Sequence, residues 1–122
     1  MGVTDTSSST LEWAVSEMLK NPRVLEKAQA EVRHVFNRKE NVDEARLHEL
    51  EYLKLVIKEN SWLHPSTPLI PRECIKSCKI DGYDIPVGSK VIVNAWAIGI
   101  DPNYWTEPEN FSSERFHSSS IN

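Results

Sequence analysis

One stretch carries most of the fold information: EYLKLVIKENSWLHP, which runs from Glu51 to Pro65. It predicts a helix that stops at Pro65, because the residue before a proline is pushed out of helical dihedrals. On this helix, residues three, four or seven positions from Glu59 are apolar or aromatic and share its face, namely Tyr52, Leu55, Val56 and Leu63. A buried carboxylate costs several kcal/mol unless it is paired. We therefore expect an arginine elsewhere in the chain to pair with Glu59 in a structural rather than a catalytic role.

The overall composition describes an ordinary soluble chain. Its 122 residues are 39% hydrophobic and 26% charged, which allows one domain with a modest core. A net charge of −4 without a basic stripe argues against nucleic acid as a partner. No apolar run is long enough for a membrane segment, and no signal peptide is expected.

The two cysteines, Cys74 and Cys78, do not make a disulfide framework. Their C-x-x-x-C spacing lacks further ligands nearby, so no metal site is predicted. We expect free thiols in a reducing compartment.

The first half of the chain predicts helices. Residues 4–10 are serines, threonines and an aspartate, which taken alone favour a linker or a poor helix start. An apolar stripe at helical spacing then covers residues 11–19. Asn21-Pro22 predicts a cap and the first residue of a second helix that continues to about Arg38, with Glu31 on its solvated face. A short helix is expected from Glu44 to Leu50.

The second half predicts a small antiparallel sheet followed by coil. Residues 79–86 combine two strands with an Asp81-Gly82 turn, residues 90–94 are β-rich, and residues 95–100 suit one helical turn. The predicted fold class is α+β, mostly α, in one partial domain. Its parts are a helical region (1–64), a small sheet and turn (65–100) and an irregular segment (101–122).

Several motifs occur together and in order. They are Thr4-Asp5-Thr6-Ser7, Lys58-Glu59-Asn60-Ser61-Trp62-Leu63-His64-Pro65, Pro71-Arg72-Glu73-Cys74, Gly82-Tyr83-Asp84-Ile85-Pro86, Val91–Gly99 and Phe111-Ser112-Ser113-Glu114-Arg115-Phe116. Each motif alone is weak, but their order and spacing together resemble cytochrome P-450, the heme-thiolate monooxygenases, and most closely the plant microsomal type. The resemblance covers essentially the whole chain. It implies a fragment of that fold, from the distal helix to the E-R-F motif.

The resemblance implies catalytic roles for Asp5 and Thr6. Splitting O2 requires protons in a site otherwise kept dry, and a hydroxyl beside a carboxylate relays them through water. Without the resemblance, the same two residues fit a helix cap better.

The resemblance also implies binding and structural roles. Arg72 would bind a heme propionate, since a guanidinium pairs well with a carboxylate; its alternative is a surface ion pair with Glu73 or Asp84. Val3, Leu69 and Ile70 would line the substrate pocket, although Leu69 and Ile70 also suit plain core. Glu59 and Arg115 would belong to a buried Glu–Arg–Arg cluster.

The sequence departs from the family pattern inside the matched region. Trp62 stands where the E-x-x-R arginine is expected, so Glu59 is left with Arg115 alone, at a cost of about 3–5 kcal/mol. Val3 stands where glycine is usual and would crowd the oxygen site. Ser113 replaces a proline, which is expected to loosen a turn at small cost.

The family's heme-ligating cysteine lies in a glycine-rich loop that neither Cys74 nor Cys78 resembles. Without that thiolate the iron has no proximal ligand, so this chain alone is expected to be inactive. The parent enzyme would insert one atom of O2 into a small apolar substrate of plant secondary metabolism, using heme and electrons from an NADPH-dependent reductase. It would lie on the cytosolic face of the endoplasmic reticulum membrane, whereas this chain alone would be soluble or aggregate in the cytoplasm. The alternative is a decayed non-catalytic remnant or a heme-free helical interaction module.

Overall fold

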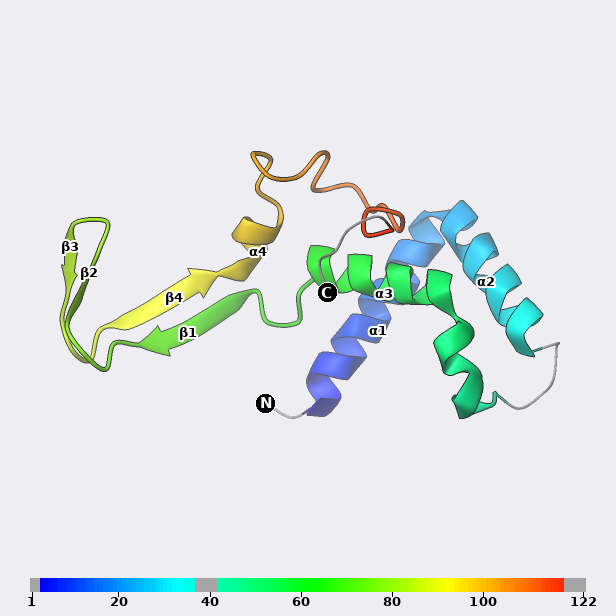
Figure 1. Cartoon of the computed structure of the whole chain (residues 1–122), viewed down its shortest axis with the longest axis horizontal. Helices are drawn as coiled ribbons and strands as arrows, with labels where there is room; N and C mark the ends of the chain where they lie inside the picture. The colour runs from blue at the N-terminus through cyan, green and yellow to red at the C-terminus, as the bar shows by residue number, and fades with distance from the viewer. Residues whose placement is uncertain (1–2, 37–41, 118–122) are drawn as a thin grey trace.

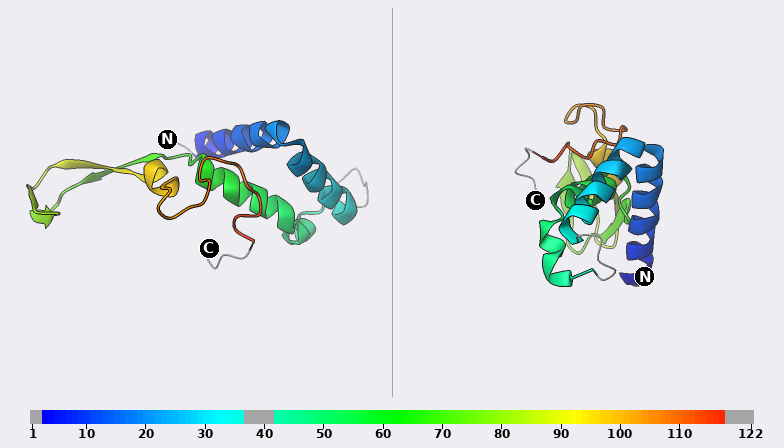
Figure 2. Two further views of the ribbon diagram at one scale, coloured as in Figure 1. Left: turned by 90° about the horizontal axis from the view of Figure 1, so that it is seen from above. Right: turned by 90° about the vertical axis from the view of Figure 1, so that its right-hand side faces the viewer.

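The computed structural model describes residues 3–36 and 42–117 and shows a group of helices from which a β ribbon projects (Figure 1). The elements, in chain order, are α1 (Val3–Lys20), α2 (Pro22–Phe36), the 3-10 helix η1 (Glu44–Glu49), α3 (Glu51–Leu63), β1 (Leu69–Glu73), β2 (Cys78–Ile80), β3 (Tyr83–Ile85), β4 (Lys90–Asn94) and α4 (Ala95–Gly99). Residues 101–117 form an irregular segment that returns to the helices (Figure 2). The predicted α+β class, mostly α with a small antiparallel component, is confirmed.

Helix α1 begins much earlier than its polar residues suggest. It includes residues 4–10, so the expectation of a linker there is wrong. Within this stretch the Thr10 hydroxyl donates to the Thr6 carbonyl, one turn back. The buried Asn60 amide of α3 also donates to the Thr10 carbonyl at 3.0 Å. Packing against α3 thus outweighs the weak local propensity.

Helices α2 and α3 are joined by a cap that the sequence did not indicate. Leu50, at the start of α3, offers no side-chain cap. Instead, the Glu31 carboxylate of α2 accepts from the backbone N–H groups of Tyr52 and Leu53, at 2.8 and 2.9 Å. The expectation that Glu31 lies on a solvated face is therefore wrong, since it satisfies the free donors of a helix end. The adjoining apolar core consists of Val32, Val35, Phe36, Leu50 and Leu53.

The β region contains two antiparallel pairs. The β2–β3 hairpin turns at Asp81 and Gly82, whose φ angles of 48° and 84° match the predicted tight turn. Strand β1 contains Pro71, and neither this strand nor its pairing with β4 was predicted from the sequence. In a two-stranded pair each strand has an open edge, and such an edge tolerates proline.

Candidate functional site

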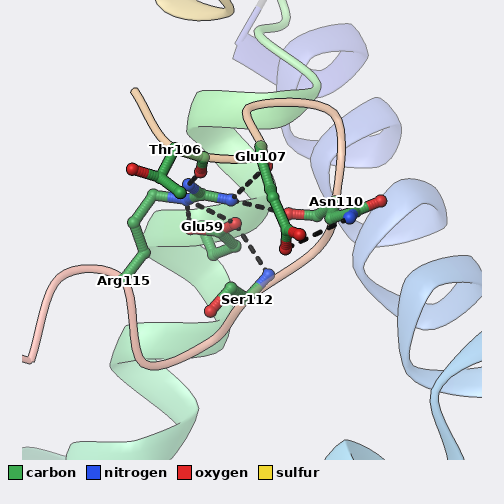
Figure 3. A network of polar contacts seen from close by, with 6 residues as sticks. All are labelled: Glu59, Thr106, Glu107, Asn110, Ser112 and Arg115. Atoms are coloured by element: carbon green, nitrogen blue, oxygen red, sulfur yellow. Dashed lines mark hydrogen bonds and ion pairs between the residues drawn. The ribbon is translucent and has the colours of Figure 1, made fainter. Parts of the chain in front are cut away.

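The centre of the candidate site is the Glu59 carboxylate on α3, whose side chain is fully buried. Arg115 Nε lies 3.1 and 3.2 Å from its two oxygens, and the Ser112 backbone N–H donates to Oε1 at 2.8 Å (Figure 3). Both partners come from the irregular segment after α4. The structure therefore brings Glu59 and Arg115 together, but it corrects the expectation that Arg115 alone satisfies the carboxylate.

Arg115 also organises the loop that surrounds Glu59. Its terminal nitrogens donate to the backbone carbonyls of Thr106, Glu107 and Asn110, at 2.8, 3.1 and 2.6 Å (Figure 3). The planar guanidinium, with donors in a fixed fork, suits this kind of multiple contact. One side chain thus neutralises a buried charge and satisfies three carbonyls of a segment that has no regular structure.

The environment of Glu59 acts on its acidity in two directions. Desolvation by burial raises the pKa of the Glu59 carboxyl, whereas the Ser112 N–H and the Arg115 guanidinium oppose that rise. The result is a pKa above the ordinary value for glutamate. The carboxylate therefore depends strongly on these partners to remain charged.

Trp62 occupies the position one helical turn beyond Glu59 and contacts Arg115. The Arg115 guanidinium carbon lies 4.5 Å from the Trp62 ring centroid, a cation–π contact. The same ring packs at 4.9 Å from Trp105 and at 6.1 Å from Phe116, measured between centroids. Trp62 does not neutralise Glu59, yet it stacks on the arginine that does. Stacking of Trp62 on Arg115 and the Ser112 hydrogen bond are two contacts that the predicted cost of losing an arginine here did not include.

Ser113 also has a partner that its sequence position did not predict. It is buried, and its hydroxyl lies 2.8 Å from the Tyr52 hydroxyl of α3. This contact ties the irregular segment to the first turn of α3. The expectation that serine merely loosens a turn is therefore incomplete, because the hydroxyl adds a hydrogen bond that proline cannot make.

The predicted distal residues lie near the start of α1. Asp5 is exposed and Thr6 is half-buried. Thr6 lines an open cavity of about 400 Å³ together with residues of α3 and the following loop, among them Ile57 and Ser66. The side chain of Val3 lies outside the described residues.

The other predicted site residues lie on β1 and do not line this cavity. Leu69 is 51% exposed and Ile70 is half-buried. Arg72 is exposed, and its Nη1 donates to the Pro71 carbonyl at 3.0 Å. The structure therefore groups Thr6 with Ser66 and places Leu69, Ile70 and Arg72 further along the ribbon.

Sequence reasoning missed a polar cluster between α1 and the end of α3. The Trp13 and His64 rings stack at 4.0 Å with an interplanar angle of 9°. His64 Nε2 and Lys20 Nζ lie 3.1 and 2.9 Å from Oε1 of Glu17, which is buried. Trp13 and Glu17 are one helical turn apart on α1, so their spacing could have indicated that the two side chains share one face of the helix.

The Glu17 cluster makes the fold acid-sensitive. Desolvation by burial would raise the pKa of the Glu17 carboxyl, but hydrogen bonds and charges from Lys20 and His64 outweigh it and leave the pKa lowered. A lowered native pKa stabilises the fold above the unfolded value of about 4.3, and this stabilisation is lost as pH falls through the native pKa. Glu17→Gln is expected to show a shallower loss of unfolding free energy below about pH 5 than the unsubstituted chain.

Urea unfolding across the acid range measures this difference. Glu12→Gln, which alters an exposed carboxylate of the same helix, is the matched control and should keep the full acid dependence. Equal slopes for Glu17→Gln and the unsubstituted chain would contradict the assignment.

Comparisons with known proteins agree with the resemblance seen in the motifs. The family model described as "Cytochrome P450" matches residues 1–122, the whole chain. The chain therefore belongs to the cytochrome P450 family. Its geometry agrees, since a zebrafish cytochrome P450 structure with progesterone superimposes with a TM-score of 0.85 at 33% identity. That match covers 97% of this chain and 28% of the zebrafish chain.

Plant members of the family are more similar in sequence. Tabersonine 16-hydroxylase 1 of Catharanthus roseus is 61% identical over 119 residues, and cytochrome P450 71D8 of Glycine max is 62% identical over 118. Each match covers 97% of this chain but only 24% and 23%, respectively, of the relative. The chain thus spans about a quarter of the length of these plant relatives.

The described residues hold neither a membrane span nor a metal cluster. Within residues 3–36 and 42–117, no helix has the length and apolar character needed to cross a bilayer. The same ranges contain no group of three or more potential His, Cys, Asp or Glu ligands. Cys74 and Cys78 are both free thiols.

Proposed function

We propose that this chain is part of a heme-dependent monooxygenase that inserts one atom of O2 into a small apolar substrate of plant specialised metabolism. The observation that carries the proposal is the collinear family match over residues 1–122, together with 61% identity to a plant hydroxylase. Electrons would come from an NADPH-dependent reductase. The parent enzyme would lie on the cytosolic face of the endoplasmic reticulum.

Heme would supply oxygen activation, and the described residues offer a partial fit to it. Arg72 is exposed and makes one hydrogen bond to a backbone carbonyl, so its guanidinium keeps donors for a propionate carboxylate. Cys74 and Cys78 lie in the β region, away from α1 and α3 (Figure 1). We therefore assign neither of them to heme iron.

Asp5 and Thr6 would handle protons at the distal side. Thr6 lines the cavity between α1 and α3, where its hydroxyl would hold a water molecule and pass a proton inward. Asp5 is exposed and adjoins Thr6, so its carboxylate would exchange protons with solvent. Leu69, Ile70 and Val3 would contribute apolar surface on the substrate side.

Thr6→Ala in the full-length enzyme is expected to lower product formation by about 10²-fold, the low end for a positioned proton-transfer group. NADPH consumption should fall much less, because reduction precedes the proton-dependent step. Product and NADPH are measured together in a reconstituted reductase assay, with Ser9→Ala on the exposed side of α1 as the control.

That assay and a carbon-monoxide spectrum of the full-length protein separate the two claims. A carbon-monoxide spectrum without a thiolate-type band in the full-length protein would contradict the proposed function itself. A normal spectrum with unchanged product per NADPH in Thr6→Ala would contradict only the role given to Thr6.

The second candidate is a heme-free helical interaction module or a decayed remnant. It is favoured by the apolar stripe Leu11, Val15 and Leu19 of α1, in which Leu11 and Leu19 are each 66% exposed. Heme titration and thermal melting of the 122-residue chain test the second candidate. A cooperatively melting monomer that binds no heme supports the module, whereas an aggregating product supports the remnant. A thiolate-type spectrum from this chain alone would refute both, together with the expectation that the chain alone is inactive.

A further inference from the structure

Two cysteines lie where the β ribbon changes from one strand pair to the other. Cys74 directly follows β1, and Cys78 is the first residue of β2. The chain bends between them, and the β2–β3 hairpin sits at the far end of the ribbon (Figure 1). The Cys74 backbone extends the β1–β4 pairing, since its N–H donates to the Ser89 carbonyl and its own carbonyl accepts from the Gly88 N–H.

The bend brings both cysteines to Ile85 of β3. Cys74 Sγ donates to the Lys76 carbonyl at 3.0 Å and lies 3.7 Å from the Ile85 carbonyl oxygen. Cys78 is the register partner of the same Ile85 across the hairpin. The pairing of β2 with β3 therefore places both cysteines beside the same residue, Ile85.

The thiols differ in access to solvent. Cys78 is exposed, whereas Cys74 is half-buried under the bend. The exposed Cys78 thiol is therefore the one that a small-molecule disulfide reaches first.

We propose that Cys74 and Cys78 form a thiol–disulfide modification site for small-molecule disulfides of the glutathione class. The Cys78 thiolate attacks the oxidised glutathione disulfide, forms a mixed disulfide and releases one glutathione thiolate. The Cys74 thiolate then attacks Cys78 Sγ and releases the second glutathione. The protein loses two protons and two electrons, and one glutathione disulfide becomes two glutathione thiols.

Oxidation joins two structural units that the reduced chain connects only through a bend. Cys74 is fixed to the β1–β4 pair by its backbone hydrogen bonds, and Cys78 belongs to the hairpin. The new bond closes a short ring across the bend and restricts movement of the hairpin relative to β1. Because Arg72 and Leu69 lie on β1, the modification acts on the strand that carries proposed binding residues.

The test is a redox titration of the 122-residue chain in glutathione buffers of increasing oxidised fraction. Samples are acid-quenched, free thiols are alkylated, and the chain is digested with trypsin. Trypsin cleaves after Arg72, Lys76 and Lys79, so the two cysteines fall in separate peptides. The disulfide then appears as residues 73–76 joined to residues 77–79.

We expect this joined peptide pair to form at a value of [GSSG]/[GSH]², from the oxidised and reduced glutathione concentrations, about tenfold lower in the folded chain than in the chain unfolded in guanidinium. That factor corresponds to about 30 mV for a two-electron couple. Cys74→Ser should stop at the Cys78–glutathione mixed disulfide, and Cys78→Ser should react more slowly because Cys74 is half-buried. Circular dichroism checks that both variants keep the fold of the parent chain.

Three results would overturn the proposal. One is formation of the Cys74–Cys78 disulfide in the same glutathione buffer by the folded and the unfolded chain, which would make the disulfide a property of the local sequence alone. Another is glutathione retained on both cysteines, and the third is a product linked between chains. Each is visible in the same digest, so none depends on activity of a heme-loaded enzyme.

Discussion

Arg115→Met is expected to lower the free energy of unfolding by about 3–5 kcal/mol, the range for removing one partner of a buried ion pair. Glu59 would keep only the Ser112 N–H, and the carbonyls of Thr106, Glu107 and Asn110 would lose their donors. Chemical unfolding of both chains, followed by circular dichroism, gives the difference. Arg46→Met is the matched control, because the Arg46–Glu49 pair is exposed and its loss should not be measurable.

Two further measurements on Arg115→Met test the cause of the loss. Burial already raises the pKa of Glu59, and removal of the guanidinium raises it further, so the folded variant takes up a proton more readily than its unfolded state. The stability deficit should shrink as pH falls. Adding Glu59→Gln should also recover part of it, since a neutral side chain leaves no buried charge. A deficit that is independent of pH would refute the ion-pair explanation.

Trp62→Ala is expected to cost about 3 kcal/mol, near the low end for truncating a buried aromatic ring. The ring is half-buried, and it contacts Arg115, Trp105 and Phe116. Trp62→Phe keeps an aromatic face and should cost clearly less. Unfolding measurements on Trp62→Ala, Arg115→Met and the double variant isolate the contact between the two side chains.

The double-mutant cycle decides whether Trp62 supports Arg115. Cation–π contacts contribute about 0.5–2 kcal/mol, so a coupling energy in that range is expected. Additive losses would mean that Trp62 fills space without acting on the arginine. In that case the expectation from the sequence would stand, namely that Trp62 in place of the family's arginine only weakens the buried cluster.

The sequence predicted those features of the structure that depend on residues close together in the chain. Pro65 set the end of α3, Asp81-Gly82 set the hairpin turn, and the apolar face around Glu59 required a cationic partner. These features follow from backbone sterics and from the cost of burying charge.

The remaining features depend on partners far away in sequence. Strand β1 contains a proline and shows no alternation, and its pairing with β4 joins Leu69 to Asn94. The polar start of α1 is helical because α3 packs against it. The stacking of Trp62 on Arg115 required an irregular segment to return to α3, which no periodicity describes.

The return of that segment also sets an order of events during folding. Helices α1 to α3 adjoin one another in the chain, whereas Glu59 meets its partners across 53 and 56 residues. Closing so long a loop is slow compared with helix formation. Until Arg115 docks, the Glu59 carboxylate lacks its guanidinium partner. Burial of the Glu59 carboxylate therefore follows the packing of the helices, and the Arg115 guanidinium that arrives with the irregular segment stabilises the charge in the interior.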